Sequence, residues 1–419
     1  MNVFASLLKL SDLRQRLLFT CGVIILYRLG THIPISGIDL TAIEQLFSSN
    51  GLLGFIDMFS GGALSRFSLF ALGILPYINA SIIMQMMTFV SPKLKDLAQE
   101  GLSGQKQMAQ YTRYLTLAIA LIQGTVMAVG FRSFVQPDIN IAFFLFYSIV
   151  GLSAGSVLVM WFGEVMTEKG IGNGASILIF VGIISQLPFY IKNTVLLINS
   201  GVSKVSVVIL LMALLLLTLL IVIIQEAQRR VQVQYARRVV GRKMMGGNST
   251  YIPLRLIQGG VLPIIFASAL LQFPLMISEY SNIEALQQFM NTYYRYDGFA
   301  YNAFFCFLIF FFTYFYTAIS FDPKQISDTI KKHGGFILGI RPGAPTVQYL
   351  DKVVSKLTLT GAVALSFIAL IPTVAANFTG IDTFRGLGGT ALLIMVAVAM
   401  DFYKQVETYL INRKYDSYT

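Results

Sequence analysis

Histidine and cysteine, two residue types common in catalytic and metal sites, are scarce in this chain. The 419 residues include two histidines, His32 and His333, and two cysteines, Cys21 and Cys306. A catalytic or metal site needs several such groups close together, and the topology derived below places the histidines on opposite faces of a membrane. Both cysteines stand in apolar runs, where a thiol more often acts as a small buried hydrophobic group than in a disulfide or a metal site. We therefore predict no enzyme activity, with no catalytic residue, metal or cofactor.

One glycine-rich motif, GIGNG at residues 170–174, is superficially similar to a phosphate-binding loop. Such a loop follows a strand and opens a helix, whereas this motif precedes a long apolar run. Asn173 is also a residue type that caps the start of a helix. We therefore interpret the motif as a tight turn that leads into a helix, and we assign no ligand to it.

The composition is that of a polytopic membrane protein. Hydrophobic residues make up 55% of the chain and charged residues 12%, which is about half the charged fraction usual in soluble domains. Apolar windows of about 20 residues predict ten transmembrane helices and an all-α fold. The predicted spans are 17–34, 67–90, 112–131, 142–163, 176–195, 205–225, 256–278, 299–321, 356–375 and 386–401. The first run ends without a cleavage site, so we interpret it as a retained signal anchor.

Positive charge sets the predicted orientation. With ten spans both termini lie on one side, and most of the 31 Lys and Arg residues fall on that side, which makes it cytoplasmic. Two cytoplasmic loops, 226–255 and 322–356, are longer than a connection requires. The first contains VQVQY, whose alternation predicts a strand of a hairpin, and the second has a Gly- and Pro-rich tip around Arg341. These basic loops predict docking of something acidic or large, such as a ribosome, a motor protein or anionic lipid.

The ten spans divide into two sets of five, in residues 1–200 and 201–419. Because five is odd, equivalent spans of the two sets run in opposite directions, which is the inverted-repeat arrangement with a pathway between the halves. No ionisable side chain lies near the middle of a predicted span, and Arg28 stands near the outer end of the first. Ion-coupled transporters place such groups at mid-membrane, so the sequence disfavours ion coupling.

Residues 54–87 indicate how such a pathway is closed. A short apolar segment, 55–59, is followed by Gly61 and Gly62 and then by a long apolar run. Irregular backbone at membrane depth survives only against protein or a water-filled cavity. The broken segment therefore predicts a pore lining or a gate.

Two isoleucines of this stretch, Ile78 and Ile82, lie four residues apart and so share a helical face. An isoleucine pair in a membrane helix most often faces lipid. Spacing alone therefore assigns them no functional role.

Several longer segments are closely similar to one known family. They read MFSGGALSRFSLFALGILPYINASII, WFGEVMTEKGIGNGASILIF, GVLPIIFAS, GIRPG with the following DKVVSKLTLTG, and GGTALLIMV with its MDF. The chain resembles the SecY family, the central subunit of the general protein-translocation channel. The match runs from the first span to the C-terminal region, in order and with the expected number of spans.

This resemblance implies a fold and a function. SecY-like proteins are two five-span halves around an hourglass pore, with a plug on the outer side and a lateral gate between the second and seventh spans. The chain would pass unfolded secretory polypeptide across the membrane and release apolar segments sideways into lipid, driven by the SecA motor or the ribosome. Other expected partners are the SecE and SecG small membrane subunits, signal peptides, nascent polypeptides and the lipid bilayer. The expected location is the plasma (inner) membrane of a bacterium, or an organelle membrane of bacterial descent, with both termini cytoplasmic.

The resemblance also implies roles for particular residues. The isoleucine ring of the pore maps to Ile78, Ile82, Ile179, Ile265 and Ile394, and its remaining position to Ala175, where isoleucine is more usual. The plug maps to about 55–64 and includes Phe55, Ile56, Met58, Phe59, Gly61, Gly62 and Leu64. The residues expected to dock the motor or the ribosome are Arg237, Arg238, Arg242, Lys243 and Arg341.

Two other hypotheses remain open. One is a small-solute secondary transporter built on inverted repeats, and the other is a membrane insertase without a through-pore. Movement of a preprotein across a reconstituted membrane distinguishes both from a polypeptide channel.

Overall fold

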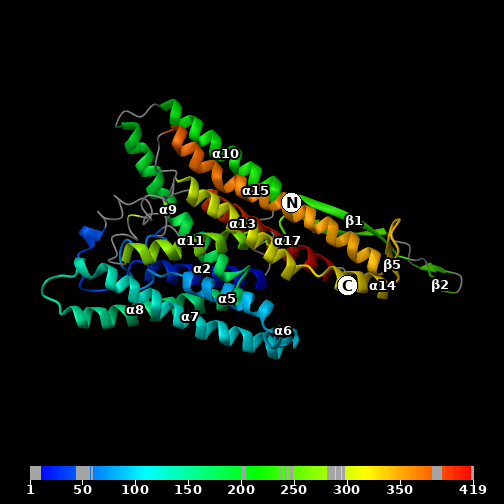
Figure 1. Cartoon of the computed structure of the whole chain (residues 1–419), viewed down its shortest axis with the longest axis horizontal. Coiled ribbons are helices and arrows are strands. Elements are labelled where there is room, and N and C mark those ends of the chain that lie inside the picture. The colour runs from blue at the N-terminus through cyan, green and yellow to red at the C-terminus, as the bar shows by residue number, and fades with distance from the viewer. Residues whose placement is uncertain are drawn as a thin grey trace.

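Helices account for most of the chain in the computed structural model (Figure 1). The structure describes residues 11–43, 57, 60–199, 204–235, 238–240, 243–245, 249–280, 288, 294, 298–379 and 389–416. Within these residues, one helix overlaps each predicted span. These helices are α2 (Ser11–Gly30), α5 (Leu75–Val90), α7 (Leu102–Gly130), α8 (Ile141–Lys169), α9 (Gly174–Asn199), α10 (Lys204–Glu226), α11 (Leu262–Tyr280), α13 (Phe299–Ser320), α15 (Ala344–Thr379) and α17 (Gly389–Asp416). Three short helices connect them, α6 (Pro92–Gln99), η1 (Phe131–Phe134) and α14 (Pro323–Lys332).

Length and hydropathy identify the helices that cross a membrane. Among the described residues, 7 helices are long and apolar enough, namely α7, α8, α9, α10, α13, α15 and α17. The apolar helices α5 and α11 are shorter, and the 20 residues of α2 include several charges. The chain is therefore a multi-pass helical membrane protein, while the count of ten spans stays a prediction.

The second predicted span, 67–90, begins too early. The helix starts at Leu75, and the residues before it form turns and bends. Phe67 has φ +42° and Gly73 has φ +55°, values that a right-handed helix excludes, and Pro76 suits the first turn of a helix. Phe67 is also fully buried. Hydropathy therefore misassigned these residues, because turns enclosed by protein are as apolar as a span in lipid.

The long helices pack in two groups. In the first group α7 packs against α5 and α8, and α8 packs against α9. In the second group α15 packs against α10, α13 and α17, and α13 packs against α11. Figure 1 places α7 and α8 along the lower edge of the molecule and α10 and α15 along the upper edge. The groups meet where α11 packs against α5 and α7, and where α9 packs against α17 and α10.

A small sheet protrudes at one end of the molecule, beside α14 (Figure 1). Strands β1 (Gln228–Tyr235) and β4 (Ser249–Arg255) pair antiparallel, and β5 (Gly335–Ile337) pairs with the other edge of β1. The predicted strand at VQVQY is confirmed, with Val231 and Val233 buried and their neighbours exposed or half-buried. The pairing of β5 was not predicted, and it joins the two long basic loops into one body.

The helix α15 extends beyond its predicted span, which began at residue 356. Its 36 residues correspond to about 54 Å of helix, well over the ~30 Å hydrocarbon core. Leu350 and Val354 of its first part pack in one apolar cluster with Val231 and Ile337 of the sheet. The extra turns of α15 therefore support the protruding sheet.

Candidate functional site

The five isoleucines predicted to line the pore lie in the interior, at the meeting of four helices. Ile78 and Ile82 come from α5, Ile179 from α9, Ile265 from α11 and Ile394 from α17. All five have exposed fractions of 5% or less and belong to the same apolar cluster. The spacing of four places Ile78 and Ile82 on one face of α5, and that face points into the protein. The common interpretation of such a pair as facing lipid is wrong here.

The fifth predicted span presents a similar face. Ala175, Ile179 and Ile183 follow each other at intervals of four along α9, so they share one side of the helix. Ile179 and Ile183 are buried, and the half-buried Ala175 packs against the same cluster. The smaller alanine side chain fills less space at this point than isoleucine would.

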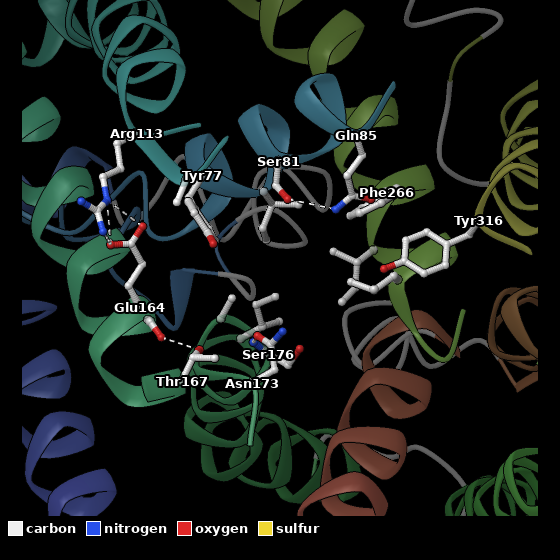
Figure 2. Close-up of a pocket in the computed structure, with 17 residues that line it drawn as sticks. Tyr77, Ser81, Gln85, Arg113, Glu164, Thr167, Asn173, Ser176, Phe266 and Tyr316 are labelled. Atoms are coloured by element: carbon white, nitrogen blue, oxygen red, sulfur yellow. Dashed lines mark hydrogen bonds and ion pairs between the residues drawn. The ribbon is translucent and has the colours of Figure 1, made fainter. Parts of the chain in front are cut away.

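A cavity of about 390 Å³ lies against this apolar cluster. Three of the five isoleucines, Ile78, Ile179 and Ile265, are part of its lining. The rest of the lining is largely polar and comes from α5, α7, α8, α9 and the turn before it, α11 and α13. Figure 2 shows ten of these lining side chains: Tyr77, Ser81, Gln85, Arg113, Glu164, Thr167, Asn173, Ser176, Phe266 and Tyr316. The cavity therefore has a lining of mixed polar and apolar side chains that becomes wholly apolar at the isoleucines.

One ion pair stands in the wall of this cavity. Arg113 on α7 and Glu164 on α8 face each other in Figure 2, with Nε 3.0 Å from both carboxylate oxygens and Nη2 2.9 Å from Oε2. Such a paired arrangement leaves little net charge on the wall. Sequence analysis missed this pair, since each residue lies near the end of a predicted span and no spacing rule connects two helices.

The helices α5 and α11 contact each other beside the cavity. Ser81 and Gln85 on α5 are joined by a hydrogen bond of 3.2 Å, and Phe266 of α11 lines the same cavity (Figure 2). Phe89 of α5 also packs against Phe315 of α13, with ring centroids 6.0 Å apart. The second and seventh helices of the predicted order are therefore in contact in this structure.

The predicted plug lies only in part within the described residues. Phe55, Ile56, Met58 and Phe59 fall outside them. Gly61 and Gly62 have φ of +68° and +83°, values that favour glycine, and Leu64 is buried in a separate apolar cluster. The predicted break at the two glycines is confirmed as a turn.

The predicted docking residues all belong to the protruding basic loops. Arg237 and Arg242 lie outside the described residues, whereas Arg238 is in β2 (Arg238–Val240) and Lys243 in β3 (Lys243–Met245), which pair as a hairpin. Arg341 is exposed in the turn after β5, where its carbonyl accepts a hydrogen bond of 2.9 Å from Thr346 Oγ1. The loop tip is thus held by its backbone, and the guanidinium is accessible to a partner.

The glycine-rich motif forms the predicted turn between α8 and α9. Asn173 Oδ1 accepts a hydrogen bond of 3.2 Å from the amide of Ser176, as a residue capping a helix does. A Cβ on Gly174 would lie 2.0 Å from the carbonyl oxygen of Gly163. The glycine is therefore required by close packing of α8 and α9.

The cysteines differ in exposure. Cys21 on α2 is exposed and Cys306 on α13 is half-buried, each as a free thiol. The prediction of a buried hydrophobic role is wrong for Cys21, because the outer surface of a membrane helix is as apolar as a protein core. An apolar run in the sequence does not by itself show whether a residue in it is buried or exposed.

Two helix groups that meet around a dry apolar cluster, beside a polar cavity, define a helical membrane channel. The SecY family model matches residues 68–403, and the chain is 41% identical to protein translocase subunit SecY of Thermotoga maritima over 100% of this chain and 97% of that protein. The chain belongs to the SecY family of protein-translocation channels.

Two solved structures share this fold. One is a SecY protein whose plug domain is described as stabilising the closed state of the translocation channel and maintaining a membrane seal. It has a TM-score of 0.65 and 20% identity, and the match covers 94% of this chain and 92% of that chain. The other is Sec61 in the canine ribosome–channel complex from the endoplasmic reticulum, with a TM-score of 0.61, 17% identity and the same coverages.

Proposed function

We propose that unfolded secretory polypeptide crosses the membrane between the two helix groups, through a neck formed by Ile78, Ile82, Ile179, Ile265 and Ile394. The observation that carries this proposal is the burial of all five in one apolar cluster at the edge of a polar cavity. Branched apolar side chains at a narrow neck disfavour a continuous water column, so the resting channel excludes ions. A ring without polar groups also yields to a chain of any sequence, because it binds none of them specifically.

The lateral gate of the proposal is the contact between α5 and α11. When these helices separate, an apolar segment in the neck reaches lipid, where about 20 apolar residues are stable as a helix. A polar segment has no such gain and continues along the aqueous path. The chain therefore sorts secreted and membrane segments by partition, without catalysis of its own.

The two five-span halves of the proposal are residues 1–200 and 201–419, with the plug at about 55–64. The division agrees with the packing of the described helices in two groups that meet at α5 with α11 and at α9 with α17. The glycine turn at Gly61 and Gly62 lies within this proposed plug. We assign the plug the role of sealing the outer side of the neck.

The energy for translocation comes from partners that bind the protruding basic loops. The sheet β4–β1–β5, the β2–β3 hairpin and the exposed Arg341 are presented to a SecA motor or a ribosome. Arginine suits both, because its planar guanidinium pairs with phosphate and with carboxylate. The positive-inside rule makes this end and both termini cytoplasmic, in a bacterial plasma membrane or an organelle membrane of bacterial descent. SecE and SecG are the proposed small membrane partners.

Reconstitution tests this proposal. The chain is assembled with SecE and SecG in liposomes, and a secreted preprotein is added with SecA and ATP. We expect the preprotein to become protected from external protease, and deletion of residues 55–64 to increase the ion permeability of the resting vesicles. Uptake of small solutes without polypeptide movement would overturn the proposal in favour of a secondary transporter. Insertion of membrane proteins without protease protection of the preprotein would indicate an insertase.

A further inference from the structure

The turn at Gly61 and Gly62 is tied to the first helix by a charged side chain that no step above uses. Arg28, near the end of α2, donates a hydrogen bond of 2.9 Å from Nη1 to the carbonyl oxygen of Gly61. The same nitrogen lies 3.0 Å from Ser185 Oγ on α9. One guanidinium group therefore joins three parts of the chain that are far apart in sequence.

Two backbone carbonyls define how Ser185 takes part. Ser185 Oγ accepts from Arg28 and donates its own proton to the carbonyl oxygen of Gly182, at 2.6 Å, while the Gly61 carbonyl oxygen lies farther away, at 3.5 Å. A Cβ on Gly61 would lie 3.0 Å from both Arg28 Nη1 and the Cα of Gly182. The turn is thus seated in a notch between α2 and α9, where only glycine fits without a shift.

The turn is also held together internally by a buried carboxylate. Asp57 Oδ1 accepts hydrogen bonds from the amides of Leu64 at 2.9 Å and Ser65 at 3.0 Å, and from Ser60 Oγ at 3.0 Å. Asp57 is only 7% exposed. Asp57 is therefore linked to Ser60, Leu64 and Ser65, and a hold on Gly61 is a hold on this hydrogen-bonded turn.

A charged residue in an apolar span is costly unless it has partners. Arg28 is half-buried, and its hydrogen bonds are charge-assisted, which makes them stronger than bonds between neutral groups. These hydrogen bonds go to the turn and to the helix beside it. The hydrogen bonds to the Gly61 carbonyl and to Ser185 therefore explain why an arginine is tolerated at this position.

We infer that Arg28 is a positioning residue that latches the turn at residues 60–65 to α2 and α9 and so keeps the resting channel sealed. The inference rests on the proposed role of the plug. Opening requires the bond from Arg28 to the Gly61 carbonyl to break, while the bond to Ser185 stays in place. The latch thus stabilises the closed state, although Arg28 does not line the path of the translocating polypeptide.

The test compares ion leak from vesicles that contain the assembled, resting complex. Arg28→Gln removes the charge, and we expect about a tenfold increase in leak, the ratio that corresponds to about 1.4 kcal/mol. Arg28→Lys should restore most of the seal, since an ammonium group also donates to a carbonyl and a hydroxyl. The matched control is Arg132→Gln, which changes an exposed arginine and should leave the leak at the parental level. Ser185→Ala removes one anchor and should give a smaller increase.

A double-mutant cycle tests whether Arg28 acts through the turn. The deletion of residues 55–64 alone should increase leak, and adding Arg28→Gln to it should change nothing further, because the latched carbonyl is gone. If Arg28→Gln and the deletion increase leak additively, the latch is overturned. It is also overturned if the deletion of residues 55–64 leaks while the assembled Arg28→Gln complex leaks no more than the parent. If the deletion itself does not leak, the proposed seal is wrong, and the latch that depends on it is overturned with it.

Discussion

Replacement of Ile394 by asparagine is the most direct test of the proposed neck. Ile394 on α17 is 0% exposed and lies in the apolar cluster shared by the five isoleucines. The substitution keeps the side chain close to its original size and places an amide where the surroundings are dry. We expect Ile394→Asn to favour the open channel, in which the neck is wetted.

The size of the effect follows from burial. Full burial of an isoleucine side chain is worth about 1.5–3 kcal/mol, and a buried amide without partners costs about 1–3 kcal/mol. Both terms act on the closed state, and both are relieved when the neck is hydrated. Even a shift of about 3 kcal/mol, in the lower part of this range, changes the ratio of closed to open channels by roughly a hundredfold.

Two assays measure this change. Vesicles with the resting complex should leak ions faster than the parent, and the complex should accept preproteins with defective signal sequences. Ile394→Leu is the conservative control, since a swap of similar volume usually costs less than about 1.5 kcal/mol. Ile221→Asn controls for general damage, because Ile221 on α10 is 1% exposed in the same cluster but is not assigned to the neck. Parental leak and parental signal selection in an assembled Ile394→Asn complex would refute the assignment.

Two further predictions concern the docking loop and the packing of α8 on α9. Arg341→Glu reverses an exposed charge outside the core, so motor-driven translocation should fall at least severalfold while the complex stays assembled; undiminished preprotein transport would exclude a docking role. Gly174→Ala places a Cβ 2.0 Å from the Gly163 carbonyl and should destabilise the protein by about 1–3 kcal/mol, seen as a lower melting temperature. Its control is Gly22→Ala, whose Cβ meets nothing within 4 Å, and equal melting of the two variants would contradict the close contact.

Hydropathy predicts the helices well because a backbone in lipid must satisfy its own hydrogen bonds. The same signal fails where protein replaces lipid as the apolar surroundings, as at the buried Phe67 before α5. It also fails to separate a buried residue from one on the outer surface of a membrane helix, as at the exposed Cys21. A run of apolar residues does not record which side of a helix faces the interior. Whether a given side chain is buried or exposed therefore follows only from how the helices pack.

The candidate site was only partly predictable for a related reason. The positions of the five isoleucines came from the resemblance to the SecY family, because their spacing alone is that of any membrane helix. The pairing of Arg113 with Glu164 and the bond from Arg28 to Gly61 join separate elements. Neither follows from local sequence rules, which describe neighbours within one helix or strand.

The strand β5 connects the two basic loops mechanically, because it pairs with β1 of the other loop. Because β1 continues from α10 and β5 leads through a short turn into α15, a force on either loop reaches the same pair of helices. A partner that pushes on one loop therefore displaces the other loop as well, and the two loops move as one body attached to the second helix group. Among the described residues, the displacement reaches the first group where α11 meets α5 and α7, where α9 meets α10 and α17, and where Phe89 of α5 meets Phe315 of α13.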